Sequence, residues 1–319
     1  MRVSLSLPTH RVDVPELVSA AGIRRMAQAA EAAGFDAVFV TEHPFPGDAW
    51  LATGGHHALD PFVALSVVAA STERLRLQTN LLVLAYRNPF LAAKAIASLD
   101  AVSGGRTIVG VGAGYLEPEF EALGVGLGER NELLDEALTA IRAAWTGESV
   151  TMEGRHWRAA ANTMLPSPVQ RPGPPIWVGG NSARAMRRAV ELGDGWVPMF
   201  APASVSARVR SRAIPSIAAL AERISEAHQH AEAAGRTTPF DVAFSPPGAA
   251  LDARSREQVG RLVDTIGELA AAGVTFLNAG VPGDGIEEIV ENVAWFGAEV
   301  LPAIDGIAVR RYAEPAPLG

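Results

Sequence analysis

The residues with the clearest capacity for chemistry are a glutamate and a histidine that follow a short apolar run. Glu42 and His43 come directly after residues 37–41, which read AVFVT. Imidazole gains or loses a proton near neutral pH, so His43 is the best of the seven histidines for general acid–base catalysis. We predict that Glu42 orients it. The alternative interpretation is a histidine that only completes a hydrogen bond in the scaffold.

A second pattern, Gly179-Gly180-Asn181-Ser182, has the composition of an anion-binding turn. Two glycines let the backbone approach an anion. Asn181 or Ser182 can cap a following helix, whose first N–H groups then point at the bound group. An ordinary turn between a strand and a helix has the same composition. The local sequence therefore supports an anion-binding turn and an ordinary turn equally well. Residues 283–285 (GDG) offer a competing position, although the aspartate there would repel an anion.

A third pattern is the run Gly110-Val111-Gly112-Ala113-Gly114, which carries little side-chain bulk. A flat ring system could lie against such a backbone, and we favour that interpretation. Close packing between elements, or a β-bulge, would need the same glycines.

The remaining histidines are not spaced along the sequence as metal ligands usually are. His56 and His57 lie in a glycine-rich stretch and, with Trp50, are expected to line an entrance. His228 and His230 are two residues apart on a predicted helix and do not share a face. The chain has no cysteine, which excludes disulfides and a catalytic thiol, and we predict no metal.

The elements that must position these residues alternate strictly between strand and helix. Strands are predicted at 2–7, 37–41, 75–82, 107–112, 175–178, 195–199, 241–245 and 274–279. Helices are predicted at 16–33, 61–71, 89–102, 129–145, 182–192, 204–234, 255–272 and 285–300, with a hairpin insert near 150–157 after the fourth.

Alternation predicts a parallel sheet with right-handed crossovers, and an open doubly wound sheet would satisfy it as well. Eight units within 319 residues favour a single (β/α)8 TIM barrel of the α/β class. We expect residues 1–302 to form the catalytic barrel and 303–319 a loosely ordered tail. Active sites of such barrels lie at the carboxyl ends of the strands, which is where the three patterns fall.

Composition narrows the class of partner. With 48% hydrophobic and 19% charged residues the chain is typical of a soluble globular protein. A net charge of -8 and a pI near 5.4 argue against nucleic acid or an anionic membrane. No apolar run could span a membrane and the start lacks a signal peptide, so a cytoplasmic enzyme is expected.

Five segments make the sequence resemble the bacterial luciferase-like superfamily, and within it the oxidoreductases that use the deazaflavin coenzyme F420. They are residues 32–43, 79–89, 103–106, 110–120, and 175–181 continuing to 194–196. The likeness covers nearly the whole chain from Arg2 to about Val300. It also implies a homodimer, which is common in this superfamily.

The resemblance implies roles for most of these residues. A non-proline cis peptide is expected at Thr79-Asn80 or one residue further on, forming a bulge behind the cofactor ring. The ring or its tail would be flanked by Ala113, Gly114 and Tyr115. The phosphate would be held by Gly179, Gly180 and Asn181, and His43 would lie near the reactive carbon.

One departure bears on the substrate. Sugar-phosphate dehydrogenases of this superfamily have a carboxylate where Tyr115 stands and use lysines for the substrate phosphate, whereas Lys94 is the only lysine here. We therefore expect hydride transfer between F420 and another small organic substrate, which Phe45, Trp50 and Tyr115 suggest is apolar or aromatic. An FMN-dependent monooxygenase that uses reduced flavin and oxygen is the alternative, and a non-catalytic flavin- or deazaflavin-binding protein is the second alternative.

Overall fold

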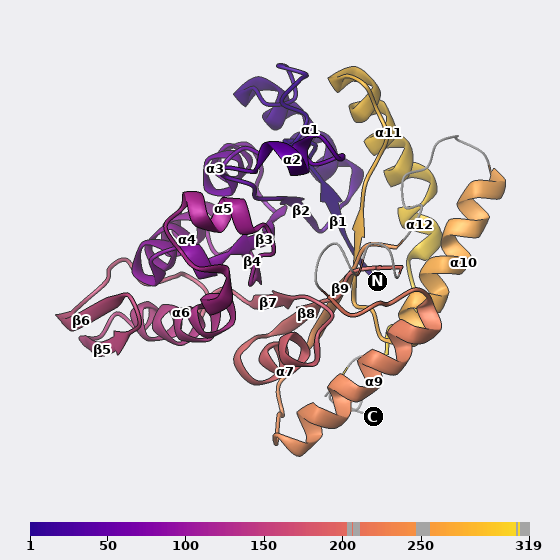
Figure 1. Cartoon of the computed structure of the whole chain (residues 1–319). Coiled ribbons are helices and arrows are strands. Elements are labelled where there is room, and N and C mark those ends of the chain that lie inside the picture. The colour runs from indigo at the N-terminus through magenta and orange to yellow at the C-terminus, as the bar shows by residue number, and fades with distance from the viewer. Residues whose placement is uncertain (203–205, 207–210, 247–255, 311, 313–319) are drawn as a thin grey trace. The chain divides into compact units, whose positions relative to one another are not determined.

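Eight parallel strands close into a barrel, as predicted. The strands are β1 (Arg2–Ser6), β2 (Ala37–Val40), β3 (Arg76–Val83), β4 (Thr107–Gly112), β7 (Ile176–Gly179), β8 (Gly195–Val197), β9 (Asp241–Phe244) and β10 (Phe276–Ala279). Their order around the barrel is β1-β10-β9-β8-β7-β4-β3-β2 (Figure 1). This computed structural model describes residues 1–202, 206, 211–246, 256–310 and 312.

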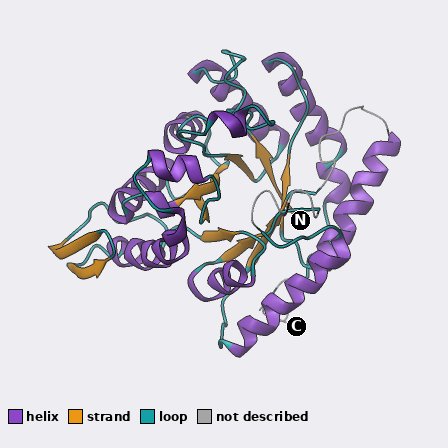
Figure 2. Cartoon of the chain, viewed as in Figure 1, coloured by secondary structure: helices purple, strands orange, loops and turns teal. Residues whose placement is uncertain are grey.

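Helices alternate with the strands along the chain (Figure 2). The longer ones are α1 (Ala20–Ala33), α3 (Pro61–Ser71), α4 (Pro89–Ser103), α6 (Arg130–Trp145), α7 (Ala183–Leu192), α9 (Ile217–Ala233), α10 (Arg256–Ala272) and α11 (Ile286–Glu299). The short ones are α2 (Asp48–Leu51), η1 (Leu84–Tyr86), α5 (Glu117–Ala122), η2 (Leu127–Glu129) and α12 (Leu301–Ile304).

The chain divides into two compact units, each described by itself. Unit 1 comprises residues 1–6, 28–38 and 177–319, and unit 2 comprises residues 7–27 and 39–176. The histidine at the end of β2, the glycine-rich end of β4 and the hairpin all belong to unit 2. The Gly179–Asn181 turn belongs to unit 1.

Side-chain caps fix the start of the two helices that follow β2 and β3. The Asp60 carboxylate accepts hydrogen bonds from two backbone N–H groups at the start of α3, at 2.9 and 3.1 Å. Asn88 does the same for α4. In each case a proline takes the first helical position, where no N–H is needed. These local signals explain why both helices begin where the sequence predicts.

The predicted helix at 204–234 is wrong in its first part. Helix α9 begins only at Ile217, and residues 211–216 are not helical. Ile214 instead forms a backbone bridge with Ala201, and Pro215 has no N–H to give to a helix. Residues 203–205 and 207–210 lie outside the described part of the chain.

The hairpin insert is longer than predicted. Strands β5 (Val150–Gly154) and β6 (Trp157–Asn162) pair antiparallel, with a turn at residues 155–156. Trp157 packs edge-on against Phe90 of α4, with ring centroids 5.0 Å apart. The hairpin therefore rests on the outer helices of unit 2 (Figure 1).

The start of the predicted tail is ordered against unit 1. Helix α12 runs across the expected boundary at 302, and Tyr312 forms a backbone bridge with Phe240. The Tyr312 hydroxyl donates to the Arg236 carbonyl at 2.8 Å. The two tail prolines, Pro315 and Pro317, lie outside the described residues.

Candidate functional site

His43 lies at the centre of a cluster of rings in unit 2. Its ring centroid is 4.5 Å from that of Trp50, 4.9 Å from His56 and 6.3 Å from Tyr115. His10, which follows β1, meets His56 at 5.3 Å. The structure thus brings together predicted residues that follow β2 and β4, and adds His10, which follows β1 and carried no predicted role.

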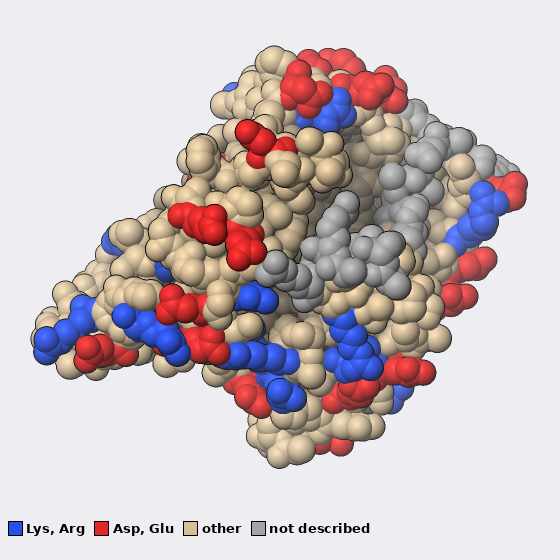
Figure 3. All heavy atoms as spheres, in the orientation of Figure 1, with Lys and Arg blue, Asp and Glu red and all other residues tan. Residues whose placement is uncertain are grey.

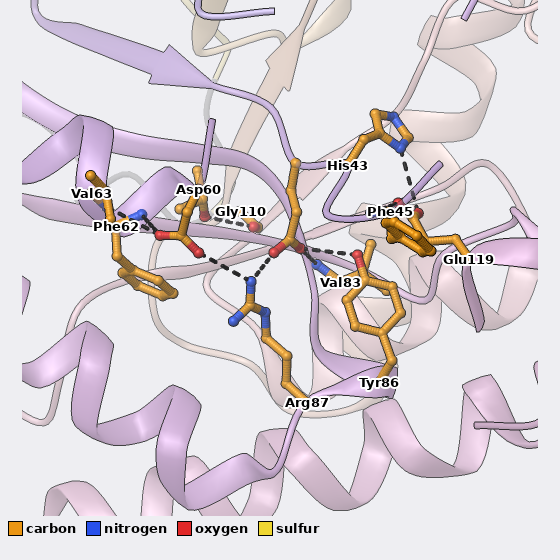
Figure 4. Close-up of polar contacts among 12 residues, drawn as sticks. His43, Phe45, Asp60, Phe62, Val63, Val83, Tyr86, Arg87, Gly110 and Glu119 are labelled. Carbon is orange, nitrogen blue, oxygen red and sulfur yellow. Dashed lines mark hydrogen bonds and ion pairs between the residues drawn. The ribbon is translucent and has the colours of Figure 1, made fainter. Parts of the chain in front are cut away.

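The carboxylate beside His43 is Glu119, which the sequence analysis missed. Its Oε2 lies 3.5 Å from His43 Nδ1, within ion-pair reach but long for a hydrogen bond (Figure 4). Its Oε1 accepts the backbone N–H of Phe45 at 3.0 Å. The Glu119 side chain is only 4% exposed, so this carboxylate is held in a fixed place between the two contacts.

Glu42 has a different role from the one predicted. Its carboxylate pairs with Arg87 and accepts the Val83 N–H at 2.7 Å and the Tyr86 hydroxyl at 3.3 Å. Arg87 also lies 3.7 Å from Asp60, the cap of α3 (Figure 4). Glu42 therefore ties the end of β2 to the end of β3, and the orienting contact with His43 belongs to Glu119.

Because this network is buried, the pKa values of its groups are shifted. Burial raises the pKa of Glu42, while Arg87 and the Val83 N–H oppose that rise. Burial, and then the negative charge of Glu42, raise the pKa of the Tyr86 hydroxyl far above its ordinary value. Tyr86 therefore stays a neutral hydrogen-bond donor.

Trp50 is placed over His43 by a compact turn. It belongs to α2, and its backbone carbonyl accepts the N–H groups of Thr53 and Gly55. A Cβ added at Gly55 would lie 2.3 Å from the Trp50 ring, so only glycine lets the chain fold back this closely. The indole is thereby held against His43, whose own side chain is 10% exposed.

Strand β3 carries the expected cis peptide, at Asn80-Leu81. It coincides with a shift of the β3–β4 register between Thr79 and Leu82, and the Thr79 hydroxyl donates to the Gly110 carbonyl at 2.7 Å. The Asn80 Oδ1 is buried and has no hydrogen-bond partner among the described residues. This bulge is an irregular, partly unsatisfied surface at the end of the strand.

The glycines of β4 serve packing rather than offering a bare backbone to a ring. A Cβ at Gly110 would lie 2.1 Å from the Thr79 carbonyl oxygen, and the Leu81 side chain already covers Gly112. Gly114 has a φ of 79°, and a Cβ there would lie 2.5 Å from the Phe120 ring. The interpretation of this run as a flat ring platform is therefore wrong at Gly110 and Gly112. The half-buried residues that follow, including Ala113 and Tyr115, stay candidates.

In unit 1 the Gly179–Asn181 turn leads directly into the start of α7. Gly180 adopts a φ of 114°, and Ser182 rather than Asn181 caps α7, accepting the Ala185 N–H at 3.1 Å. The amide of Asn181, fully buried, bonds to Met199 on both its nitrogen and its oxygen. Asn181 thus supports the turn, and residues 182–184 are exposed at the helix start.

The competing position before α11 is less suited to an anion. The Asp284 N–H is already bonded to the Glu288 carboxylate at 2.9 Å, and Glu287 lies in the same first turn. The first turn of α7 contains no acidic residue. Because negative charge at a helix start occupies the site an anion would use, α7 is the better candidate.

The two half-buried histidines of the cluster resist protonation. Burial, and then the neighbouring His43, lower the pKa of His56. Burial, and then His56 and Arg11, lower the pKa of His10. Crowded imidazoles disfavour a second positive charge, so His10 and His56 stay neutral to lower pH than free histidine.

Other site classes find no support in the described residues. They contain no group of three or more His, Asp or Glu side chains arranged for a metal ion. None of their helices is long and apolar enough to cross a membrane. On the face drawn in Figure 3, basic and acidic side chains are mixed, with no single basic patch.

Sequence relatives differ in how much of the chain they match. An uncharacterized protein of Mycobacterium tuberculosis is 35% identical over 184 residues, which is 54% of this chain and 65% of the relative. An F420-dependent glucose-6-phosphate dehydrogenase of Beutenbergia cavernae is 39% identical over 174 residues, covering 53% of this chain and 49% of the enzyme. The match thus spans less than two thirds of the length of these curated relatives.

Solved structures match the fold over almost the whole chain. A monooxygenase of Streptomyces bottropensis superposes with a TM-score of 0.74 at 25% identity, covering 95% of this chain and 99% of that one. The oxygenating constituent of 3,6-diketocamphane monooxygenase from Pseudomonas putida, in complex with FMN, gives 0.75 at 19% identity, covering 97% and 100%. The luciferase-like monooxygenase family model matches residues 1–291, and the chain belongs to this family.

Proposed function

We propose that this protein is an F420-dependent oxidoreductase that transfers a hydride between the deazaflavin and an uncharged small organic substrate. The observation that carries the proposal is the pairing of His43 with the buried carboxylate of Glu119 inside a wall of aromatic rings. Such a pair can hold or move one proton beside a reacting carbon. The matched F420-dependent dehydrogenase supports the choice of cofactor.

Both units contain features that fit a phosphorylated flavin-type cofactor. In unit 2, the bulge at Asn80-Leu81 carries an orphaned amide oxygen that a ring system with hydrogen-bond donors would satisfy. In unit 1, the exposed start of α7 after Gly180 suits a phosphate. When bound, the coenzyme supplies the hydride chemistry, and the protein positions it.

The residues of unit 2 would then have three roles: proton transfer, shielding of the substrate, and support of the strands. Glu119 favours the proton on Nδ1 of His43, which leaves Nε2 as the nitrogen that exchanges a proton with the substrate. Trp50 and Tyr115, whose ring centroids lie 4.5 and 6.3 Å from that of His43, would shield the substrate from water. Glu42 and Arg87 act on neither proton nor substrate, because they hold β3 in register with β2.

The charge around His43 favours a neutral substrate. The ring neighbours of His43 that the structure describes are Trp50, His56 and Tyr115, none of them a permanent cation. The nearest strong cation in Figure 4, Arg87, is already paired with Glu42. An aromatic or apolar alcohol or ketone fits these surroundings, whereas the described ring neighbours of His43 include no cation for the charge of a sugar phosphate.

The test is a parallel titration of the purified protein with oxidised F420 and with FMN. We expect F420 to bind at micromolar concentration and FMN more weakly. A panel of neutral alcohols and ketones is then assayed with the F420 complex, and with a His43→Ala variant that should lose roughly 100-fold or more in turnover. Turnover unaffected in that variant would remove the proton-transfer role, and no F420 binding would overturn the cofactor assignment.

A second candidate is an FMN-dependent monooxygenase. It is favoured by the similarity to the S. bottropensis monooxygenase at 25% identity over nearly the whole chain. Oxygen consumption with reduced FMN supplied by a separate reductase would assign this activity. Tight binding of either cofactor, with no turnover on any substrate, would instead indicate a cofactor-binding protein.

A further inference from the structure

His43 is nearly closed off from water. Its side chain is 10% exposed, and its buried Nδ1 faces the carboxylate of Glu119 (Figure 4). In the proposed reaction His43 gains or loses one proton in every turnover. The next turnover cannot begin until that proton has been exchanged with the solution, so the fold must provide a route for it.

Two further imidazoles continue from His43 within unit 2. The centroid of the His56 ring lies 4.9 Å from that of His43 and 5.3 Å from that of His10. The three histidines come from separate stretches of the chain, after β1, after β2 and in the loop before α3. Exposed residues adjoin the two added rings, with His57 next to His56 and Val12 two positions after His10. The series of rings therefore connects His43 with the surface.

The hydrogen bonding of His56 leaves one of its nitrogens ready to accept a proton. Its Nδ1 lies 2.9 Å from the His57 carbonyl oxygen, and a carbonyl oxygen can only accept a hydrogen bond. In the neutral ring the hydrogen must therefore be on Nδ1, which leaves Nε2 unprotonated. On His43 the carboxylate of Glu119 likewise favours a proton on Nδ1, so both rings would exchange protons through Nε2.

We infer that His56 relays protons between His43 and the solution, with His10 as the outer member of the relay. This inference rests on the proposed function, because the proton is the one that His43 handles there. In the oxidative direction the O–H bond of the alcohol breaks and an N–H bond forms at His43 Nε2, while the hydride from the alcohol carbon goes to the oxidised coenzyme. The new N–H bond then breaks as another forms at His56 Nε2, and the proton passes through His10 to water. Every imidazole ends as it began, and ketone reduction uses the same steps in reverse.

The surroundings of His56 favour a proton that passes through over one that stays. The described groups in contact with its side chain are three rings and one backbone carbonyl, from His43, His10, Trp50 and His57. None of these is a carboxylate that could hold a protonated ring. Burial lowers the pKa of His56, the His57 carbonyl opposes this in part, and the charge of His43 lowers it further. A proton that reaches His56 is therefore released readily.

The outer ring, His10, lies near charges of both signs. Burial, and then His56 and Arg11, lower the pKa of His10, while Asp13 opposes them. Arg11 and Asp13 are themselves paired at 3.3 Å, so their effects on His10 partly cancel. The resulting direction is downward, and His10 would also release a proton to water rather than keep it.

Comparison of the first turnover with steady-state turnover tests the relay. We expect His56→Gln to lower kcat for a neutral alcohol roughly 10-fold with little change in KM, because each new cycle waits for His43 to lose its proton. The first turnover, followed by rapid mixing with oxidised F420, should keep the wild-type rate, since His43 starts unprotonated at pH 8. Free imidazole should restore kcat. His10→Gln should lower kcat in the same way but by less.

The matched control is His156→Gln, which removes a histidine from the turn of the hairpin, where its side chain is 56% exposed. This variant should leave both rates unchanged. Equal slowing of the first and later turnovers in His56→Gln, without rescue by imidazole, would show that the ring only packs against Trp50 and would overturn the relay. An unchanged kcat in His10→Gln would remove His10 from it.

A second measurement needs neither F420 nor a substrate. At the pH where His43 is half protonated, NMR of ¹⁵N-labelled protein gives the rate at which its ring proton exchanges with water. This exchange should be roughly 10-fold slower in His56→Gln and should recover with free imidazole. Unchanged exchange would overturn the relay. Slower exchange in a protein that never turns over with F420 would instead contradict the proposed function and leave the proton route established.

Discussion

At the scale of single residues, the proposed proton transfer depends on which nitrogen of His43 faces a carboxylate. Glu119 faces Nδ1, and its second oxygen is fixed by the Phe45 N–H. A carboxylate beside one ring nitrogen favours the tautomer that carries its proton on that nitrogen. The pair would then work in either direction of proton transfer.

A Glu119→Gln variant tests this role. We expect kcat/KM to fall roughly 100-fold with little change in cofactor affinity, because the glutamine oxygen can still accept the Phe45 N–H. Without any substrate, ¹⁵N chemical shifts should show the His43 proton moving away from Nδ1. The exposed Glu121→Gln on the same helix is the matched control. Unchanged shifts and kinetics in Glu119→Gln would assign it a purely structural role.

A second residue-scale prediction concerns pH. Burial and then His43 lower the pKa of His56 below the ordinary 6.5. Below pH 6.5 the unfolded chain therefore takes up a proton that the folded protein resists, so stability falls as pH decreases, by at most about 1.4 kcal/mol per pH unit. Above pH 6.5 both states are neutral and the effect vanishes.

Urea unfolding of the wild type and of His56→Gln between pH 7.5 and 5.5 measures this effect. The variant should lose less stability than the wild type over that range. The difference at pH 7.5 isolates the packing contribution, since His56 is neutral there in both states. If both proteins lost the same amount of stability between pH 7.5 and 5.5, the lowered pKa of His56 would be contradicted.

His43 could be predicted from the sequence because a titratable residue directly after an apolar run is a local signal. Glu119 could not be assigned, because it is 76 positions away and meets His43 only after the barrel folds. Glu119 lies within residues 110–120, a segment that resembles the family, but nothing in that segment indicates its role. Glu42 was misassigned for the same reason, since its true partner Arg87 is brought to it by the fold.

At the scale of elements, the bulge of β3 and the glycines of β4 form one packing unit. The Thr79 carbonyl occupies the space that a side chain at Gly110 would need. The composition of the glycine run was visible in the sequence, but its cause was not. A run of glycines has the same sequence whether it makes room for a ligand or for a neighbouring strand. The two cases can be distinguished only once the neighbouring strand is known.

Gly110→Ala should therefore be strongly destabilising. Its Cβ would lie 2.1 Å from a backbone atom, so β3 has to shift, at a cost of about 3 kcal/mol in the free energy of unfolding. Cofactor affinity should fall as well, because Asn80 moves with the strand. Gly267→Ala in α10, where the added Cβ meets nothing within 4 Å, should instead stabilise by about 0.5–1 kcal/mol. Comparable stability of the two variants would contradict this account.

Element boundaries were predictable where a cap or a proline marks them locally. Asp60-Pro61 and Asn88-Pro89 are such marks, and both helices begin there. The helix before Ile217 was predicted from a mixed polar and apolar pattern, whereas Pro215 and the bridge between Ile214 and Ala201 favour another path. Tertiary pairing outweighed local propensity there.

At the scale of the whole molecule, cofactor binding should appear as global stability. A ligand that binds only the folded state, at 100 times its dissociation constant, adds about 2.7 kcal/mol to the free energy of unfolding. We expect F420 to raise the urea midpoint by the corresponding amount. Riboflavin, which has no phosphate for the start of α7, serves as the control and should have little effect. Equal stabilisation by both compounds would argue against the phosphate site.

The barrel class followed from the count and alternation of elements, because few topologies accommodate eight such units. Every described end of the eight barrel strands lies within two residues of its predicted position. Burial on the outside of a barrel depends on what neighbours a helix, which periodicity does not encode.

The pairing of β1 with β10 has a consequence for how the chain is made. Arg2 lies opposite Phe276, so β1 leaves the ribosome well before β10, the strand with which it pairs. At about 5–20 residues per second, that delay is on the order of 15–55 s. Throughout it the edge of β1 that will meet β10 stays unpaired, a state that invites chaperones or wrong pairing with other nascent chains. Slowing translation before residue 276 should therefore lower the yield of soluble protein more than slowing it afterwards.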